Sequence, residues 1–216
     1  MTWMLTATGE VVDLRMIALE TIRIEDIAHH LAQINRYTGA CRRPYSVAEH
    51  ALLVCEMAET CGMTDPAQRM AALMHDAHEA YTTDLSSPMK ATIGRAWYDV
   101  EQQAQHQVLR RFGLLAASMA ARAIIKWCDL SALSSERTAL LPPNGPPWPS
   151  IAHTHPPLGW AVRNIRDRAA LTWDDWRQAF LDKFDELHFA REQRGLTLVP
   201  QGETRAAAAT PESPAA

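Results

Sequence analysis

The sequence contains no run that approaches the roughly 20 consecutive apolar residues needed to cross a bilayer. Its first residues, MTWMLTATGEVVDLR, have neither the basic region nor the apolar segment of a secretory signal. The sequence therefore predicts neither a membrane-spanning protein nor a secreted one.

Cysteine is scarce, and its four positions (Cys41, Cys55, Cys61 and Cys128) are irregularly spaced, with no CxxC pair. A disulfide framework needs a regular set of cysteines in an oxidising compartment. The pattern instead favours free thiols in a reducing compartment, and we expect a cytoplasmic protein.

Excess positive charge is also lacking. Lys and Arg number 21 and Asp and Glu number 25, which gives a formal charge of −4. Non-specific nucleic-acid binding needs a broad positive surface, so we expect no nucleic-acid partner. The 47% hydrophobic and 21% charged composition is that of an ordinary globular domain.

Hydrophobic periodicity predicts a mainly α fold: a single helical bundle over residues 1–199 with a small β-hairpin at residues 3–14 around Thr8-Gly9. Seven of the 13 prolines fall in residues 142–160, which predicts a loop. Residues 200–216 have the composition of a disordered tail. Capping boxes mark two helix starts, at Ser46 and Asp65. We expect helices over residues 25–37 (ended by Gly39), 46–60, 66–81, 97–112, 116–140 and 172–194, with a break in the chain at Ser87-Pro88.

Polar residues lie on the apolar, inward-facing stripes of three of these helices. They are His50, the pair His75-Asp76, and Asp129. A buried carboxylate costs several kcal/mol unless a positive charge compensates it. One divalent cation shared by all four side chains would do so, and two imidazoles with two carboxylates suit Zn, Mn, Fe or Co rather than Ca.

Helical geometry suggests which residues surround this cation. If residues 75–79 are helical, Glu79 projects between His75 and Asp76, beside the metal. Its carboxylate is then a candidate proton acceptor for a metal-bound water. Asp84 could approach the same pocket, and Arg36 and Lys90 are candidate phosphate clamps.

The pattern H…HD…D resembles that of the HD-domain phosphohydrolases. More narrowly, the strings YSVAEH, HDAHEAYTTDLSSPMK and KWCDLSALSSE are similar to those of YfbR-type 5'-deoxynucleotidases and of DatZ-type deoxynucleoside triphosphohydrolases of phages. The likeness covers residues 24–140, and the hairpin also fits the phage-type members.

This resemblance implies an HD-domain helical bundle in which His50, His75, Asp76 and Asp129 bind the metal. It implies catalytic roles for Glu79 and Asp84. It also implies that substrate is bound by Arg36, by Lys90, by Tyr37 as an aromatic platform, and by Gly39, whose small size leaves room beside the base.

The function expected from the resemblance is hydrolysis of a deoxynucleoside triphosphate, with a leaning towards dATP or purines, to deoxynucleoside and triphosphate. The alternative is a 5'-deoxynucleoside monophosphatase, and less favoured are a non-catalytic nucleotide-binding HD module and a structural or nucleic-acid-binding helical protein. Beside the metal (Co, Mn, Zn or Fe), Mg is an expected companion of the substrate phosphates. The resemblance also implies a homo-oligomer in bacterial or phage-infected cytosol.

Overall fold

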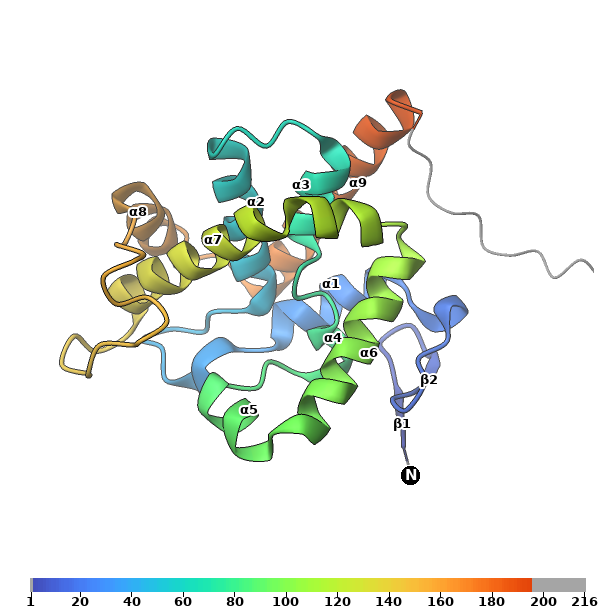
Figure 1. Ribbon diagram of the computed structural model, residues 1–216, viewed down its shortest axis with the longest axis horizontal. Helices are drawn as coiled ribbons and strands as arrows, with labels where there is room; N and C mark the ends of the chain where they lie inside the picture. Colours follow the sequence, from blue (N-terminus) through green and yellow to red (C-terminus); the bar gives the residue numbers. More distant parts are fainter. Residues whose placement is uncertain (1, 196–216) are drawn as a thin grey trace, which may run out of the picture.

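The computed structural model describes residues 2–195, and these form a mainly helical structure with a two-stranded antiparallel sheet near the N-terminus (Figure 1). The mainly α expectation with a small hairpin is thereby confirmed. The tail predicted at 200–216 and the domain boundary at 199 lie outside the described residues. Within residues 2–195, no helix is both long and apolar enough to cross a membrane.

The two strands are β1 (Trp3–Leu5) and β2 (Val11–Asp13). The helices of the described residues are α1 (Ile24–Gln33), α2 (Val47–Thr60), α3 (Pro66–Leu73), α4 (Glu79–Thr82), α5 (Ser87–Ile93), α6 (Arg95–Arg111), α7 (Leu115–Leu140), α8 (Gly159–Asp167) and α9 (Trp173–Gln193). Short 3-10 turns lie at Leu19–Thr21 and Arg36–Gly39.

The hairpin is fastened to α1 by its turn. Leu5 pairs with Val11 across the sheet, and Gly9 takes a φ of 90° that favours glycine. The backbone amide and the hydroxyl of Thr8 donate to the two oxygens of Asp26, at 2.7 and 2.8 Å. The carboxylate of α1 therefore fixes the orientation of the hairpin on the helical body.

Helix α2 lies at the centre of the bundle, and almost all of its residues are buried. Its N-cap is Ser46, whose hydroxyl accepts from the Glu49 amide at 3.1 Å, as the capping box predicts. The Glu49 carboxylate does not return to the cap; Arg43 binds both of its oxygens instead, at 2.6 and 2.8 Å. A helix that is buried on every side can carry ligands only towards other elements, and α2 contacts α1, α3, α7 and α9.

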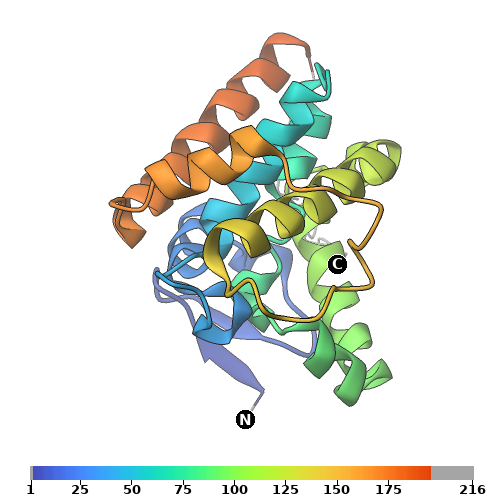
Figure 2. The same ribbon diagram turned by 90° about the vertical axis from the view of Figure 1, so that its left-hand side faces the viewer.

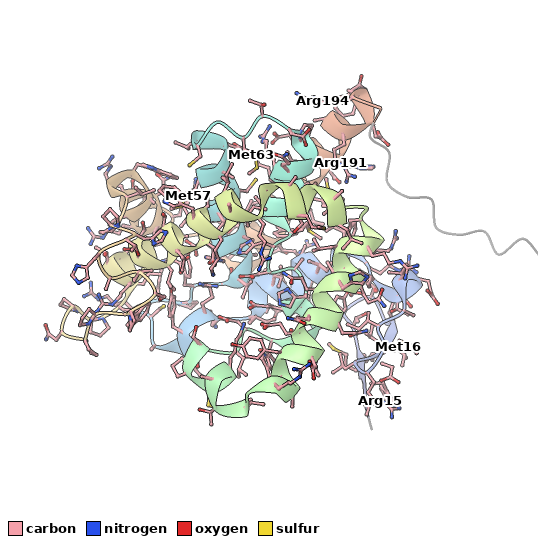
Figure 3. All side chains as sticks on the ribbon, viewed as in Figure 1. Arg15, Met16, Met57, Met63, Arg191 and Arg194 are labelled. Atoms are coloured by element: carbon pink, nitrogen blue, oxygen red, sulfur yellow. The ribbon has the colours of Figure 1, made fainter. Side chains whose placement is uncertain are left out.

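Two clusters of buried side chains meet at α2 and α3. One lies between these helices and α1, α4, α6 and α9, and the other between them and α7 and α8. Met57 and Met63, labelled in Figure 3, belong to the second cluster. Arg191, also labelled there, is buried at the end of α9 and donates to the Phe112 carbonyl at 3.2 Å. Side chains from distant parts of the sequence therefore share one continuous interior.

Three expectations about the helices are wrong in detail. The first helix ends at Gln33 rather than near Tyr37, because the chain turns extended at Ile34 and Asn35 to form a bridge with Ser46. The predicted break at Ser87-Pro88 is the start of α5, where proline in the first turn needs no amide hydrogen bond. Helix α8 was not predicted, and it takes the last two residues of the proposed 142–160 loop (Figure 2).

Candidate metal-binding site

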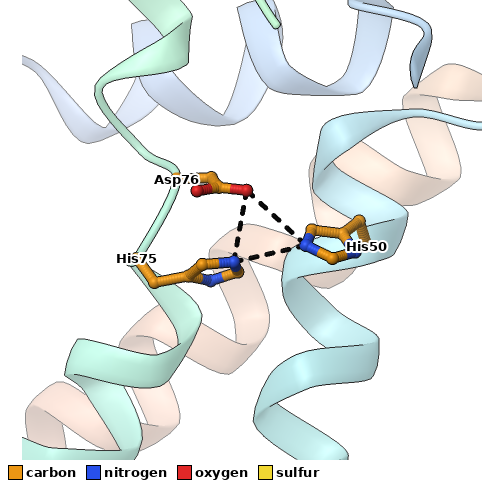
Figure 4. Close-up of side chains that lie close together, drawn as sticks. All are labelled: His50, His75 and Asp76. Atoms are coloured by element: carbon orange, nitrogen blue, oxygen red, sulfur yellow. Dashed lines mark hydrogen bonds and ion pairs between the residues drawn. The ribbon is translucent and has the colours of Figure 1, made fainter. Parts of the chain in front are cut away.

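Three side chains from α2 and from the segment after α3 converge on one point (Figure 4). Nε2 of His50 lies 3.2 Å from Nε2 of His75 and 3.5 Å from Oδ2 of Asp76. Nε2 of His75 lies 3.2 Å from the same Asp76 oxygen. His50 is fully buried, and His75 and Asp76 are partly buried. Donor atoms this close together, at a largely buried position, form a group that could hold a metal ion.

The hydrogen bonds on the opposite edges of the rings set the imidazoles up as ligands. Nδ1 of His50 lies 2.5 Å from a Glu136 oxygen, and Nδ1 of His75 lies 2.9 Å from the Ala72 carbonyl. Both partners are acceptors, so each Nδ1 carries the proton and each Nε2 presents a lone pair to the cluster. Two nitrogen lone pairs that face each other across 3.2 Å repel, and a cation between them would remove this repulsion.

The electrostatics of the cluster agree with this need for a cation. Burial and the Arg36 charge act to lower the pKa of His50, but neighbouring carboxylates, Glu136 first, outweigh them and raise it to about 9. Burial acts to raise the pKa of Asp76, yet the imidazoles of His75 and His50 hold it well below its ordinary value. The site therefore favours ionised carboxylates together with positive charge.

Asp129 of α7 approaches the cluster beside His50. Its Oδ1 lies 3.5 Å from Nε2 of His50, and its other oxygen is bound by Lys126 at 2.8 Å. Burial acts to raise the pKa of this carboxyl, but its hydrogen bond with His50 and the charges nearby lower it. The structure thus brings three of the four predicted ligands within 4.8 Å of one another and places the fourth, Asp129, beside His50. Their donor set of imidazole nitrogen and carboxylate oxygen fits a divalent transition metal.

The segment that carries His75 and Asp76 is not the continuous helix that the sequence predicted. Helix α3 ends at Leu73, and residues 74–78 form successive turns before α4 begins at Glu79. The His75 side chain takes the Ala72 carbonyl, and Gln105 of α6 donates to the His75 carbonyl at 3.2 Å. Side chains thus replace part of the helical hydrogen bonding. The predicted position of Glu79 between His75 and Asp76 assumed a helix over residues 75–79, and that assumption is wrong.

Glu136, which the sequence analysis did not single out, joins the cluster to its surroundings. It is fully buried, and it binds His50 through one oxygen and the Tyr37 hydroxyl through the other. The Tyr45 hydroxyl donates to it at 3.0 Å, and Arg36 lies 3.3 Å away. Burial acts to raise its pKa, but Arg36 and His50 lower it to about 2.

The predicted substrate residues Arg36, Tyr37 and Gly39 lie in one tight turn beside the cluster. Nη1 of Arg36 is 3.8 Å from the Asp76 carboxylate, so the guanidinium faces the ligands. Tyr37, Thr38 and Gly39 have consecutive positive φ values of 59°, 53° and 79°. A Cβ at Gly39 would meet nothing within 4 Å, so its backbone conformation, not crowding, is what favours glycine there.

The predicted catalytic carboxylates approach the cluster from the other side. Glu79 is buried, and its Oε2 has no hydrogen-bond partner within residues 2–195. Burial and the charges of Asp76 and Asp84 raise the pKa of Glu79 well above its ordinary value. Burial also raises the pKa of Asp84, against the opposing charge of Arg36. Glu79 therefore takes up a proton more readily than an ordinary glutamate does.

Lys90 lies in α5, close to both Glu79 and Glu101. Its ammonium contacts Glu101 of α6 and lies 3.9 Å from Glu79. His78, which the sequence suggested was an ordinary helix residue, is buried 3.7 Å from Glu101. His78, Glu79 and Glu101 form a second group whose donor atoms lie within 4.8 Å of one another. The structure thus places Lys90 beside the proposed catalytic carboxylate.

No protein-family model matches the chain. It is 39% identical over 117 residues to an uncharacterized protein of Rhodobacter capsulatus; this match covers 53% of the chain and 60% of that relative, less than two thirds of its length. It is also 32% identical over 133 residues to the uncharacterized protein YfdR of Escherichia coli strain K12, which covers 61% of the chain and 68% of that protein. Neither name states an activity.

Proposed function

The chain belongs to the family of the Escherichia coli protein YfdR, and we propose that it is an HD-type, metal-dependent phosphohydrolase that acts on a deoxynucleotide. The observation that carries the proposal is the convergence of His50, His75 and Asp76 on one point, with Asp129 alongside. The ligand order along the chain is that of the HD pattern. We propose a cytoplasmic enzyme with no nucleic-acid partner, and a homo-oligomer.

The four ligands would hold Co, Mn, Zn or Fe, since both imidazoles present Nε2 and the carboxylates complete a mixed set. When bound, such a cation acts as a Lewis acid that acidifies water and neutralises charge on a phosphate. Magnesium would accompany the substrate phosphates. The remaining chemistry falls to side chains of this chain.

Glu79 is the proposed proton acceptor. Its buried Oε2 makes no hydrogen bond within the described chain, so it is available to accept a proton from the attacking water. Asp84 lies close enough to Asp76 and Arg36 for their charges to affect its pKa, and its proposed role is to assist the leaving oxygen. Arg36 and Lys90 supply positive charge on two sides of the cluster, where phosphate oxygens would lie.

The substrate we favour is a deoxynucleoside triphosphate with a purine base, which would yield deoxynucleoside and triphosphate. The alternative is a deoxynucleoside monophosphate, which would yield orthophosphate. Lys90 is the residue on which this preference rests, because its ammonium, which lies 3.9 Å from Glu79 and contacts Glu101, would supply a further positive charge for a longer phosphate chain.

Product analysis tests the proposal. Purified protein is incubated with dATP, dGTP or dAMP in the presence of Co²⁺ or Mn²⁺, and tripolyphosphate and orthophosphate are separated by ion-exchange chromatography. We expect tripolyphosphate from dATP, and an Asp76→Asn variant should release none. Release of orthophosphate from dAMP alone would replace the triphosphate reading with the monophosphatase. No turnover of any nucleotide with any of these metals would contradict the proposed enzyme.

A further inference from the structure

The proline-rich segment between α7 and α8 is fixed against the candidate site rather than hanging from the bundle. Figure 2 shows residues 142–158 leaving the end of α7 as a long strap before α8 begins. Arg137 donates to the carbonyls of Gly145 and Pro146 at 3.0 and 2.9 Å. At the other end, the Leu158 amide donates to Ser135 at 3.0 Å. Both anchors come from the last two turns of α7, which also carry Glu136.

Between these anchors, Trp148 contacts the aromatic residue proposed as a substrate platform. Its ring is stacked with that of Tyr37, with centroids 6.0 Å apart and planes inclined by 28°. The Arg137 guanidinium lies 5.2 Å from the Trp148 ring centre, and that of Arg36 lies 5.4 Å from the Tyr37 ring centre. Cation, ring, ring and cation thus form a continuous row that leads outward from the ligands.

The inner end of this row is tied to the metal ligands. Arg36 lies 3.8 Å from Asp76, and the Tyr37 hydroxyl donates to Glu136, which binds His50. Tyr37 itself is held at a positive φ, a strained conformation for an aromatic residue that costs on the order of 1 kcal/mol or more. Such strain persists only where surrounding contacts fix it, and the Glu136 and Trp148 contacts do so here.

We propose that Trp148 is a specificity-determining residue, which forms with Tyr37 the aromatic surface on which the nucleobase stacks. The inference rests on the proposed function, because a phosphate held at Arg36 and the metal ligands leaves the rest of the nucleotide to extend along this row. Both side chains are only partly buried, so part of each ring is within reach of a ligand. Base–aromatic stacking tolerates every base but strengthens with ring area, and therefore favours purines.

The test compares nucleotide binding with binding of the phosphate chain alone. A Glu79→Gln background suppresses turnover, and dAMP, dCMP and tripolyphosphate are titrated by calorimetry in the presence of Mn²⁺. Into this background we introduce Trp148→Ala, Trp148→Phe and a matched control, Trp173→Ala. Trp173 is exposed at the start of α9 and contacts His29 rather than the strap. Thermal melting by circular dichroism establishes that each variant is folded.

We expect Trp148→Ala to weaken dAMP binding by about 5- to 140-fold, the range that corresponds to loss of one base–aromatic stack. Binding of dCMP should weaken less, tripolyphosphate should bind as before, and Trp148→Phe should recover much of the dAMP affinity. Trp173→Ala should behave like its parent. In protein that keeps Glu79, steady-state rates should show the same effect of Trp148 substitution in KM for dATP rather than in kcat.

Three results would overturn the inference, and they are distinguishable. Equal dAMP affinity in the parent and in Trp148→Ala would overturn it while leaving the proposed function intact. Parallel loss of dAMP and tripolyphosphate binding would show that Trp148 only supports the turn that carries Arg36. Absence of binding of dAMP, dCMP and tripolyphosphate by the Glu79→Gln parent, together with no turnover of dATP by the unsubstituted protein, would overturn the proposed function together with the inference.

Discussion

Glu136 connects the metal ligands to the turn that carries Arg36 and Tyr37. One oxygen binds the imidazole of His50, and the other accepts from the Tyr37 hydroxyl. A carboxylate on the far nitrogen of a ligating histidine fixes the tautomer and raises the basicity of the nitrogen that faces the metal. Since Arg36 also lies 3.3 Å away, the same carboxylate balances the positive charge of the substrate side.

We predict that Glu136→Gln lowers the affinity for Mn²⁺ by about 10- to 100-fold, the usual effect of losing such a partner. The amide has the same shape but no charge, and its NH₂ group would face donors. Calorimetric titration of metal into the purified variant measures the change. The control is Glu56→Gln, which removes a partly exposed ion pair with Arg168 and should leave metal affinity unchanged. Wild-type affinity in Glu136→Gln would contradict the role assigned to this residue.

The residues of the candidate metal site could be predicted from the sequence, and Glu136 could have been. His50, His75, Asp76 and Asp129 are polar residues among apolar ones, and the structure brings the first three together, with Asp129 beside His50. Glu136 lies seven residues after Asp129, two turns further along the same face of α7, and is equally out of place there. The contacts of Tyr37 with Trp148 could not be predicted, because they depend on how a proline-rich strap folds back.

Among the helices, the starts marked by capping side chains were predictable and the interruptions were not. Ser46 and Asp65 each cap a helix as their spacing indicates, and Thr172, at the predicted start of the last helix, caps α9. Helix α5 was missed because Ser87-Pro88 signals a break as readily as a first turn. Hydrophobic periodicity predicted one helix over 66–81, but it could not predict the turns at 74–78. There the His75 side chain, rather than a backbone amide, binds the Ala72 carbonyl.

The cap of α9 gives a prediction at this scale. Thr172 and Asp175 form a complete capping box, and α9 packs against α1, α2 and α3, which hold the core together. We predict that Thr172→Ala lowers the free energy of unfolding by about 1 kcal/mol, because the Asp175 amide loses its acceptor and the Asp175 carboxylate loses the hydroxyl donor. Urea unfolding followed by circular dichroism measures it.

A matched control for this cap is Thr60→Ala, at the other end of a helix. The Thr60 hydroxyl donates to the Glu56 carbonyl within the last turn of α2 and caps no free amide, so its removal should change stability by a few tenths of a kcal/mol at most. Metal affinity should be unchanged in both variants, since neither residue contacts the ligand cluster. Equal stability of Thr172→Ala and wild type would show that the cap is replaced by water.

At the scale of the whole molecule, the candidate site lies where three segments that are separate in the sequence meet. Helix α2 brings His50 from the centre, the turns after α3 bring His75 and Asp76, and α7 brings Asp129 across them (Figure 1). Helices α2 and α3 belong to both core clusters and α7 belongs to the second, so a cation bound by all three parts would link the two clusters. Binding must therefore stabilise the native state as a whole, since the unfolded chain cannot assemble the set.

We accordingly predict that Mn²⁺ or Co²⁺ at 100 times its Kd raises the midpoint of thermal unfolding by about 5–10 °C over the chelator-treated protein. The reasoning is that such occupancy adds about 2.7 kcal/mol, and 1 kcal/mol shifts the midpoint of a domain of this size by about 2–4 °C. Differential scanning calorimetry with and without metal measures the shift. Asp129→Asn should lose much of the shift, because α7 is then no longer linked to α2 through the ion, whereas Glu56→Gln should retain it. A full shift in Asp129→Asn would mean that the cation is held without α7, and that His50, His75 and Asp76 form the whole site.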